Sequence, residues 1–293
     1  MFSGLSAATA TAADKSFTLD ALTTAATVAA DGSMTVTESI VYDFRGGPFN
    51  FGIRSFLAED RSRISAFSVT GADGSTRPVI APSASESGEW EWRLGGVADT
   101  VETYTIRYVV ARAITLGTDV GELYWQFLGK DHPGVGRVDI TVDLPGSFPV
   151  ATEATDPTDA SVLRAWGHGP RQGTVGVEPS RVTLSVTGVP AGQFVEARVA
   201  VPAPAFTGDA VSGLRLPTIL DEEGAFVDQT LAEDRGRDGS ASNRTEDLGN
   251  VIGPGAGILG LAGLGAVWAR FGREPKSDPM IGEYWREPLD DPP

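Results

Sequence analysis

Apolar and polar residues alternate along most of the first two thirds of the chain. In residues 33–44, SMTVTESIVYDF, the even-numbered positions are apolar except for Glu38, and the odd-numbered positions are mostly polar. A period of two places successive side chains on opposite faces of a β-strand. Residues 19–30 precede this segment and are joined to it by Asp31-Gly32, a dipeptide suited to the left-handed φ values of a tight turn. The chain is therefore predicted to open with a β-hairpin.

The same alternation returns along residues 17–206, broken by turns rich in Gly, Pro, Asp and Ser. Many short strands at this spacing predict a mainly β fold. We expect an antiparallel β-sandwich of Greek-key type, immunoglobulin- or fibronectin-like, with insertions at residues 45–59 and 145–161. Further strands are predicted at residues 64–70, 89–94, 103–110, 122–128, 137–144, 162–166, 174–177, 182–186 and 194–201.

The shared parity of apolar residues along each strand also predicts the core. A slip of one residue would turn a whole set outward, so residues of one parity face the interior together. The predicted core residues are Val36, Ile40, Tyr42, Ile106, Tyr108, Val138, Ile140, Val142, Leu184 and Val186.

Glu38 stands on the inward parity of its strand, between Val36 and Ile40. An unpaired charge there would be expensive, so a partner is required. Arg54, in the segment FNFGIRSF, is the candidate. We expect a structural ion pair rather than an active site, because burial and pairing account for both residues.

Residues 251–269, VIGPGAGILGLAGLGAVWA, contain no charge. A helix of this length is about 28 Å long, close to the hydrocarbon thickness of a bilayer. We predict one transmembrane helix here, so the lipid bilayer is an expected partner. The alternative is a flexible linker, with which the many glycines are also compatible. Small residues four apart, such as Gly253 and Gly257, would allow helix self-association.

The remaining segments suggest a topology. Residues 1–16 begin with a small, apolar, signal-peptide-like stretch that lacks a basic start, and an ordinary N-terminus is the alternative. Arg270, Arg273 and Lys276 follow the apolar stretch. Positive residues favour the cytoplasmic side. The expected protein is a single-pass cell-membrane protein with residues 17–206 outside and a short tail, residues 270–293, inside.

Between these parts, residues 207–250 read as an acidic juxtamembrane segment. A short helix is predicted at residues 218–235, where apolar residues stand among acids, and a mobile linker at residues 236–249, which contain almost no large apolar side chain. Asn243 lies in an N-x-S/T triplet, a pattern common by chance.

The composition limits the kinds of partner and functional site that can be expected. A net charge of −16 excludes nucleic acid as an expected partner, and the absence of cysteine removes thiol chemistry and disulfides. The two histidines, His132 and His168, lie in turn-like contexts, and no serine-nucleophile elbow or metal-ligand spacing is present. We therefore expect no catalytic residue, no metal site and no cofactor.

Several motifs occur in order along the chain, and together they resemble a known family. They are DGSMTVTE at 31–38, FNFGIRSF at 49–56, ELYWQFLG at 122–129, VDITVDLP at 138–145 and GREP at 272–275. The chain resembles the predicted membrane proteins that contain domain of unknown function 2207. The resemblance implies an exported β-rich domain followed by transmembrane helices, and it implies no activity. This chain departs from the pattern by ending soon after GREP.

Two functions remain open from the sequence. The first is a membrane-anchored extracytoplasmic binding or assembly module with an unknown ligand and a protein partner. The alternative is an exported carboxylate-dependent hydrolase, suggested by the acids Glu86, Glu89, Glu91, Asp99 and Glu102. We favour the module, because these acids read as solvated strand faces and turns without a paired base.

Overall fold

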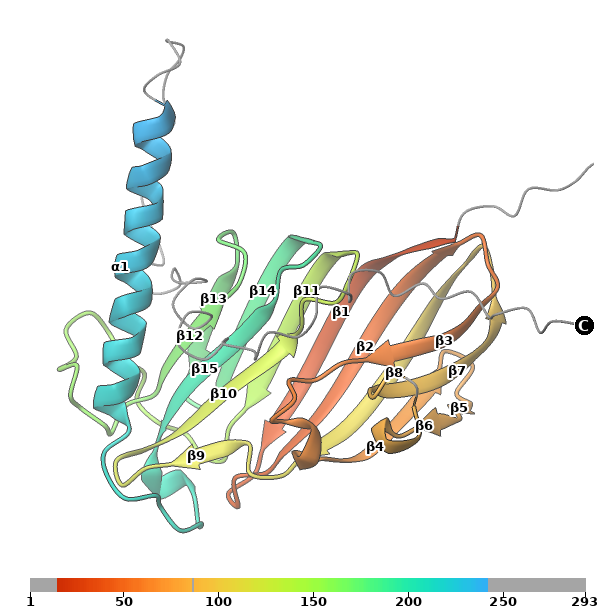
Figure 1. The fold of residues 1–293 in the computed structure, drawn as a ribbon. Coiled ribbons are helices and arrows are strands. Elements are labelled where there is room, and N and C mark those ends of the chain that lie inside the picture. Colours follow the sequence, from red (N-terminus) through yellow and green to blue (C-terminus); the bar gives the residue numbers. More distant parts are fainter. Residues whose placement is uncertain (1–14, 86, 242–293) are drawn as a thin grey trace, which may run out of the picture.

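The computed structural model describes residues 15–85 and 87–241. Its secondary structure is almost entirely β, with one long helix at the C-terminal end (Figure 1). The strands are β1 (Ser16–Val28), β2 (Met34–Arg45), β3 (Phe49–Arg54), β4 (Ile64–Gly71), β5 (Thr76–Arg77), β6 (Val79–Ile80), β7 (Trp90–Val97), β8 (Thr100–Val110), β9 (Ile114–Leu116), β10 (Val120–Leu128), β11 (Gly134–Asp143), β12 (Arg164–His168), β13 (Thr174–Glu178), β14 (Arg181–Pro190) and β15 (Val195–Pro202). The helix is α1 (Leu216–Ala241), and three 3₁₀ turns are η1 (Arg61–Arg63), η2 (Pro82–Ala84) and η3 (Ala203–Ala205).

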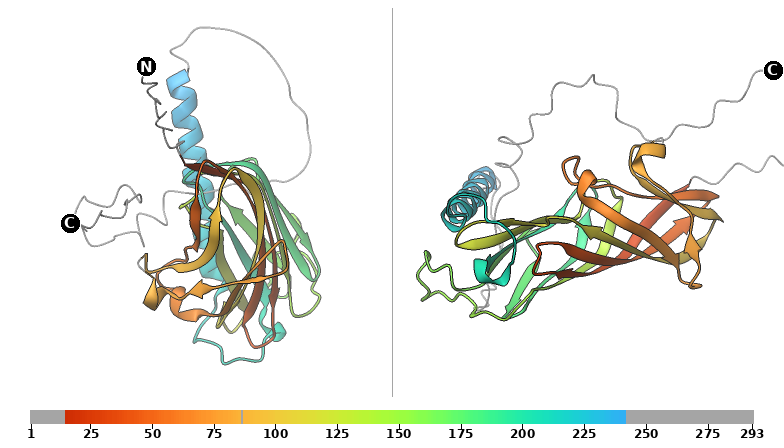
Figure 2. Two further views of the ribbon diagram at one scale, coloured as in Figure 1. Left: turned by 90° about the vertical axis from the view of Figure 1, so that its right-hand side faces the viewer. Right: turned by 90° about the horizontal axis from the view of Figure 1, so that it is seen from below.

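The strands form three sheets in two layers. One layer is an eight-stranded sheet in the order β13-β14-β11-β1-β2-β8-β4-β5. A four-stranded sheet, β12-β15-β10-β9, and a three-stranded sheet, β3-β7-β6, cover different parts of one of its faces (Figures 1 and 2). The prediction of a mainly β, layered domain is confirmed, but its second layer is divided between two separate sheets.

The expected antiparallel pairing is wrong for one pair of named strands. β1 pairs with β2 antiparallel, as the hairpin requires, and with β11 in parallel, with Leu22 opposite Val138. A parallel pair needs a long connection between its strands. The segment that runs from β2 through β10 supplies this connection. Strand alternation does not encode the direction of a partner strand so far away in sequence.

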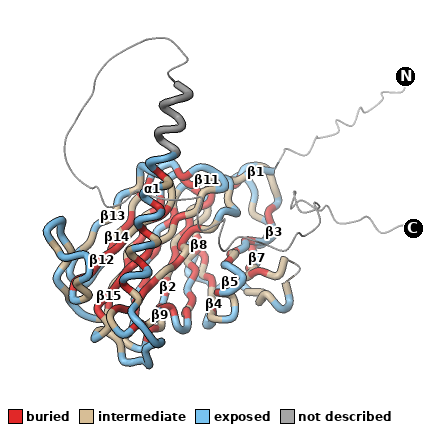
Figure 3. Tube along the Cα trace, turned by 60° about the vertical axis from the view of Figure 1, so that its left-hand side comes forward, coloured by how far each residue is buried: buried red, intermediate tan, exposed pale blue. Residues whose placement is uncertain are grey.

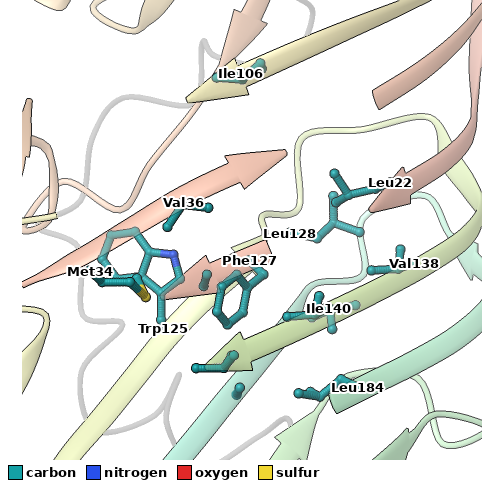
Figure 4. Packing of buried hydrophobic residues seen from close by; sticks show 14 of the residues in the cluster. Leu22, Met34, Val36, Ile106, Trp125, Phe127, Leu128, Val138, Ile140 and Leu184 are labelled. Atoms are coloured by element: carbon teal, nitrogen blue, oxygen red, sulfur yellow. The ribbon is translucent and has the colours of Figure 1, made fainter. Parts of the chain in front are cut away.

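The core lies between the two layers. All ten residues predicted to be in the core are buried. Figure 4 shows Val36, Ile106 and Val138 of the eight-stranded sheet in the same cluster as Trp125 and Phe127 of β10. The parity argument succeeds for these ten residues because each lies on a strand of the eight-stranded sheet with one face toward the core.

A β-bulge adjusts the first strand to this core. The register of β1 against β2 shifts between Leu19 and Ala21, so Asp20 is an extra residue and both Leu19 and Leu22 face inward. On β11, a Cβ at Gly136 would lie 2.6 Å from the Asp20 carbonyl oxygen. Glycine at this position therefore lets the parallel strand approach the bulge.

The structure adds detail to one predicted segment and corrects another. The predicted insertion at residues 45–59 contains β3, a strand that pairs with the distant β7, with Arg54 opposite Trp90. The predicted mobile linker starting at residue 236 is wrong at its beginning, because α1 continues to Ala241. Moreover, α1 packs on the β domain (Figure 3), so the folded unit extends beyond residue 206.

Several predictions fall on residues outside the described ranges. These are the signal-like start up to residue 14, Glu86, Asn243, the apolar stretch at residues 251–269 and the tail at residues 270–293. In the part of the chain that is described, no helix has the length and apolarity needed to cross a bilayer.

Candidate functional site: a buried ion network under helix α1

The outer face of the four-stranded sheet carries a set of charged and polar side chains. Antiparallel pairing places Tyr124 of β10 opposite Arg198 of β15, and Gln126 opposite Glu196. Their strand neighbours of the other parity, such as Trp125 and Ala197, fill the core. A face that alternation alone would assign to solvent is thus built of paired polar groups.

Arg198 is the centre of this network. Its side chain is 1% exposed, and it donates to carboxylates of Glu122, Glu222 and Glu223 at 2.6, 2.5 and 3.0 Å. Its guanidinium also lies 4.9 Å from the centre of the Tyr124 ring. Glu122 belongs to the sheet, whereas Glu222 and Glu223 belong to α1. One buried cation therefore ties the helix to the sheet.

The start of α1 is anchored from the turn before β10. The Asp119 carboxylate accepts hydrogen bonds from the backbone N–H groups of Arg215 and Leu216, at 2.7 and 3.0 Å. Free N–H groups and the positive end of the dipole make a helix N-terminus favourable for a carboxylate. Arg215 also donates to Glu122 at 2.6 Å, so Glu122 is shared by two arginines.

His168 joins the network from β12. Its Nε2 lies 3.2 Å from Glu223 of α1, and its Nδ1 lies 3.8 Å from Glu196 of β15. Tyr124 and Phe226 meet the imidazole ring edge-on. Burial alone would lower the pKa of His168, but Glu196 and Glu223 outweigh it and raise the pKa to about 9. The ring is therefore an imidazolium at neutral pH, held between two carboxylates.

Apolar contacts complete the interface. Leu216 and Ile219 of α1 are fully buried against Val120 and Ala200 of the sheet. Phe226 is buried two turns further along, beside His168. The helix is held by few apolar side chains and many charges, which makes its docking dependent on the charge states of the network.

A second buried network contains the pair predicted from sequence. Arg54 donates to both Glu38 oxygens, at 2.8 and 3.0 Å, and Tyr108 donates to Glu38 at 2.7 Å. Arg54 also donates to the carbonyl oxygen of Phe127, at 2.9 Å. Phe127 lies at a bulge in the β10–β15 ladder, where one residue is left without a regular partner. This pair thus bridges both layers, since Glu38 comes from β2 and Arg54 from β3.

Four of the other residues considered for chemistry bind neighbouring groups in the fold. His132 lies 2.6 Å from the carbonyl of Gln193 and accepts a hydrogen bond from Gly134 N–H, as a loop residue does. Glu89 pairs with Arg61, Glu91 accepts from Ser85 and Ser87, and Asp99 accepts from Gly46 N–H. Across the described ranges, no three His, Asp or Glu side chains are grouped as metal ligands.

A small cavity lies beside His168, between β12, β13 and β14. Its volume is about 30 Å³, and its lining includes Gly167, Val175 and Leu184. This is enough for about two water molecules. The cavity is therefore too small for an organic substrate.

Sequence reasoning did not find the network under α1. Glu122 and Arg198 stand on strand positions that alternation assigns to solvent, and Glu223 lies among the acids of the segment that forms α1, so none of them carries the signal that identified Glu38. Their partners lie 76 and 25 residues apart along the chain. Only the fold reveals which acid meets which arginine.

Comparison with known proteins places the chain in a family. The family described as "Predicted membrane protein (DUF2207) N-terminal domain" matches residues 18–201. The chain belongs to this family. The DUF2207 match ends at β15, before α1, so the helix-side half of the network lies outside the matched region. A search among curated proteins gave no match.

Solved structures show only distant likeness. They include a putative protease from Parabacteroides distasonis (12% identity, 62% of this chain and 40% of that chain, TM-score 0.34) and an M1 zinc metallopeptidase from Deinococcus radiodurans (13%, 62% and 42%, 0.34). Yeast LTA4 hydrolase matches with 8% identity over 62% of this chain and 28% of that chain, with a TM-score of 0.36. The chain spans less than half of each. Such resemblance transfers no activity to this DUF2207 protein.

Proposed function

We propose that this protein is a membrane-anchored binding or assembly module, with its β domain outside the cytoplasm and α1 as a rigid connector to a membrane span at residues 251–269. The observation that carries the proposal is the set of contacts made by the buried Arg198 and His168 and the half-buried Asp119, which hold α1 on the sheet. A flexible stalk would need no such anchoring. The connector would give the domain a defined orientation relative to the bilayer.

Other features support the same function. The chain belongs to a family described as predicted membrane proteins, and residues 251–269 are uncharged and long enough to span a bilayer. The β domain would act as an immunoglobulin- or fibronectin-like scaffold that presents a surface to a protein partner. The net charge of −16 argues against nucleic acid as that partner.

The test combines topology with anchoring. An epitope is placed in the β domain and another after Pro293, and protease is added to intact spheroplasts. We expect loss of the first epitope, protection of the second, and retention of the chain in membranes washed with carbonate. Protection of the β-domain epitope, or release of the whole chain by carbonate, would overturn the proposal.

An exported carboxylate-dependent hydrolase is the competing function. The observation that favours it is His168 between the carboxylates of Glu196 and Glu223, an acid–base arrangement in form. The imidazole is 5% exposed and covered by α1, so a substrate would reach it only after the helix moves. Assays of the purified chain on peptide, ester and glycoside substrates, with Glu196→Gln as the control, test this alternative.

A further inference from the structure

Helix α1 carries a second stripe beside the one that docks. The docked residues are Leu216, Ile219, Glu223, Phe226 and Thr230, all buried. The second stripe consists of Leu220, Gly224, Val227 and Leu231, spaced by four, three and four residues. At 3.6 residues per turn the two stripes are centred about 90° apart. Val227 is 45% exposed and Leu231 is 50% exposed, and Leu220 borders the docked cluster.

Gly224 lies in the middle of this stripe, and no contact within the described fold requires a glycine at this position. A Cβ placed there would meet nothing within 4 Å, and its backbone is not in the left-handed region. Glycine destabilises a helix interior relative to alanine. A glycine on an apolar helix face allows another backbone to approach closely.

In residues 216–232, the part of α1 whose side chains are described, the charges beside the stripe are all acidic. Residues 216–232 contain four carboxylates and no Lys or Arg. Glu222 and Glu223 are used by Arg198. Asp221 and Asp228 are exposed, seven residues apart, on the side of the stripe away from the sheet. The stripe is thus bordered by the β domain on one side and by an acidic edge on the other.

From this pattern we propose that the stripe at Leu220, Gly224, Val227 and Leu231 is the docking site for a basic amphipathic helix of a partner protein. The partner would place an apolar seam against Val227 and Gly224, with Lys or Arg flanking the seam toward Asp221 and Asp228. Seams spaced by four and three residues with charged flanks are how paired helices choose partners. The inference rests on the proposed function and specifies the chemistry of the protein partner.

Charge argues against a second copy of α1 as the occupant. Two copies of this helix paired in parallel and in register would bring Asp221 and Asp228 of both chains to one seam, and like charges at such positions destabilise pairing. Anionic lipid is disfavoured for the same reason. The acidic edge therefore selects a cationic partner.

The test uses the full chain purified in detergent and a fluorescent helical peptide of about three heptads, with leucine at the seam and lysine at the flanks. We expect saturable binding of this peptide and at least about tenfold weaker binding of its glutamate-flanked counterpart. The double variant Asp221→Lys, Asp228→Lys should invert this preference. The matched control, Glu153→Lys with Glu178→Lys, changes the net charge equally at exposed sites outside α1 and should bind like the wild type.

A second variant tests the close approach. In Gly224→Gln the added Cβ meets nothing within 4 Å, and glutamine favours a helix more than glycine does. The thermal stability should therefore not fall, whereas binding of the lysine-flanked peptide should weaken several-fold. The proposal is overturned if the lysine-flanked peptide does not bind, if both peptides bind equally, if the control pair weakens binding as much as the α1 pair, or if Gly224→Gln has no effect.

Because the sequence contains no cysteine, single introduced cysteines can test directly whether a second copy of the chain occupies the stripe. Val227→Cys should remain monomeric under mild oxidation, as should Thr218→Cys on another exposed side of the helix. A disulfide-linked dimer formed only by Val227→Cys would assign the stripe to a second copy and overturn the proposal. Failure of peptide binding leaves the membrane topology unaffected, whereas failure of the protease test leaves the peptide result valid, so the two proposals fail separately.

Discussion

Arg198 on β15 and Glu223 on α1 form a 3.0 Å ion pair in which the two side chains are 1% and 8% exposed. Burying two charges costs several kcal/mol in desolvation, and close geometry with further hydrogen bonds is needed to offset it. Here the further partners are Glu122, Glu222 and His168. The helix is consequently attached by interactions that are weak in sum but very sensitive to the loss of any one partner.

Removal of Arg198 should release α1. Arg198→Ala leaves buried carboxylates without their cation, which typically costs about 3–5 kcal/mol. The melting temperature should fall by about 6–20 °C for a domain of this size. Hydrogen exchange should rise first in α1 and not in β2. Arg181→Ala, which breaks a pair whose side chains are 47% and 41% exposed, is the control and should cost less than about 1 kcal/mol. Equal losses in both variants would show that Arg198 does not hold the helix.

The pH dependence of stability should reveal His168. Its pKa is about 9 in the folded protein against an ordinary 6.5, so the folded state binds the proton more tightly. This stabilisation is fully present below about pH 6.5 and is lost as pH rises through about 9. The difference between these two pKa values corresponds to about 3 kcal/mol of stabilisation. Unfolding free energies measured by denaturant between about pH 6 and pH 10 should fall with pH in the wild type and fall less in His168→Gln. Parallel curves would mean that the imidazole is not charged in the fold.

Loss of one member of the Glu38–Arg54 pair should destabilise the contact between the layers. Glu38→Ala leaves the Arg54 guanidinium and the Tyr108 hydroxyl without their acceptor. A cost of about 3–5 kcal/mol is expected, seen as a lower melting temperature. Replacing both charges together, Glu38→Leu with Arg54→Met, should cost less than Glu38→Ala alone, because no buried charge remains. An unchanged melting temperature of Glu38→Ala would contradict the burial of this carboxylate.

Two glycine-to-alanine substitutions should have opposite effects. At Gly52, a Cβ would lie 2.2 Å from the Trp92 ring, which is completely buried. Gly52→Ala should therefore destabilise the three-stranded sheet by about 1–3 kcal/mol or more. At Gly224 nothing lies within 4 Å of the added methyl group. Gly224→Ala should stabilise α1 by about 0.5–1 kcal/mol. Chemical denaturation of both variants checks the pair, and a loss of stability at Gly224 would contradict an open position there.

Much of the β domain could be predicted because its information is local. Alternation identified the long strands and the buried side of β2, β8, β11 and β14, as the burial of Val36, Ile106, Val138 and Leu184 shows. Glu38 could be assigned to the interior for the same reason, since its strand parity conflicts with its charge. The short strand β3 was missed because its outward-facing residues Phe51 and Ile53 are apolar, whereas its inward positions include Gly52, which has no side chain, and the charged Arg54.

The sequence by itself determined the fold class, the core parity and the need for a partner at Glu38, because each depends on neighbours within one strand. The tertiary structure decided the parallel pairing of β1 with β11, the division of the second layer into two sheets and the docking of α1. These depend on contacts between segments far apart in sequence. Arg198 meets Glu122 and Glu223 only after β10, β15 and α1 have packed together. Charge alone does not specify which of many acids an arginine will bind, whereas burial in one fixed geometry does.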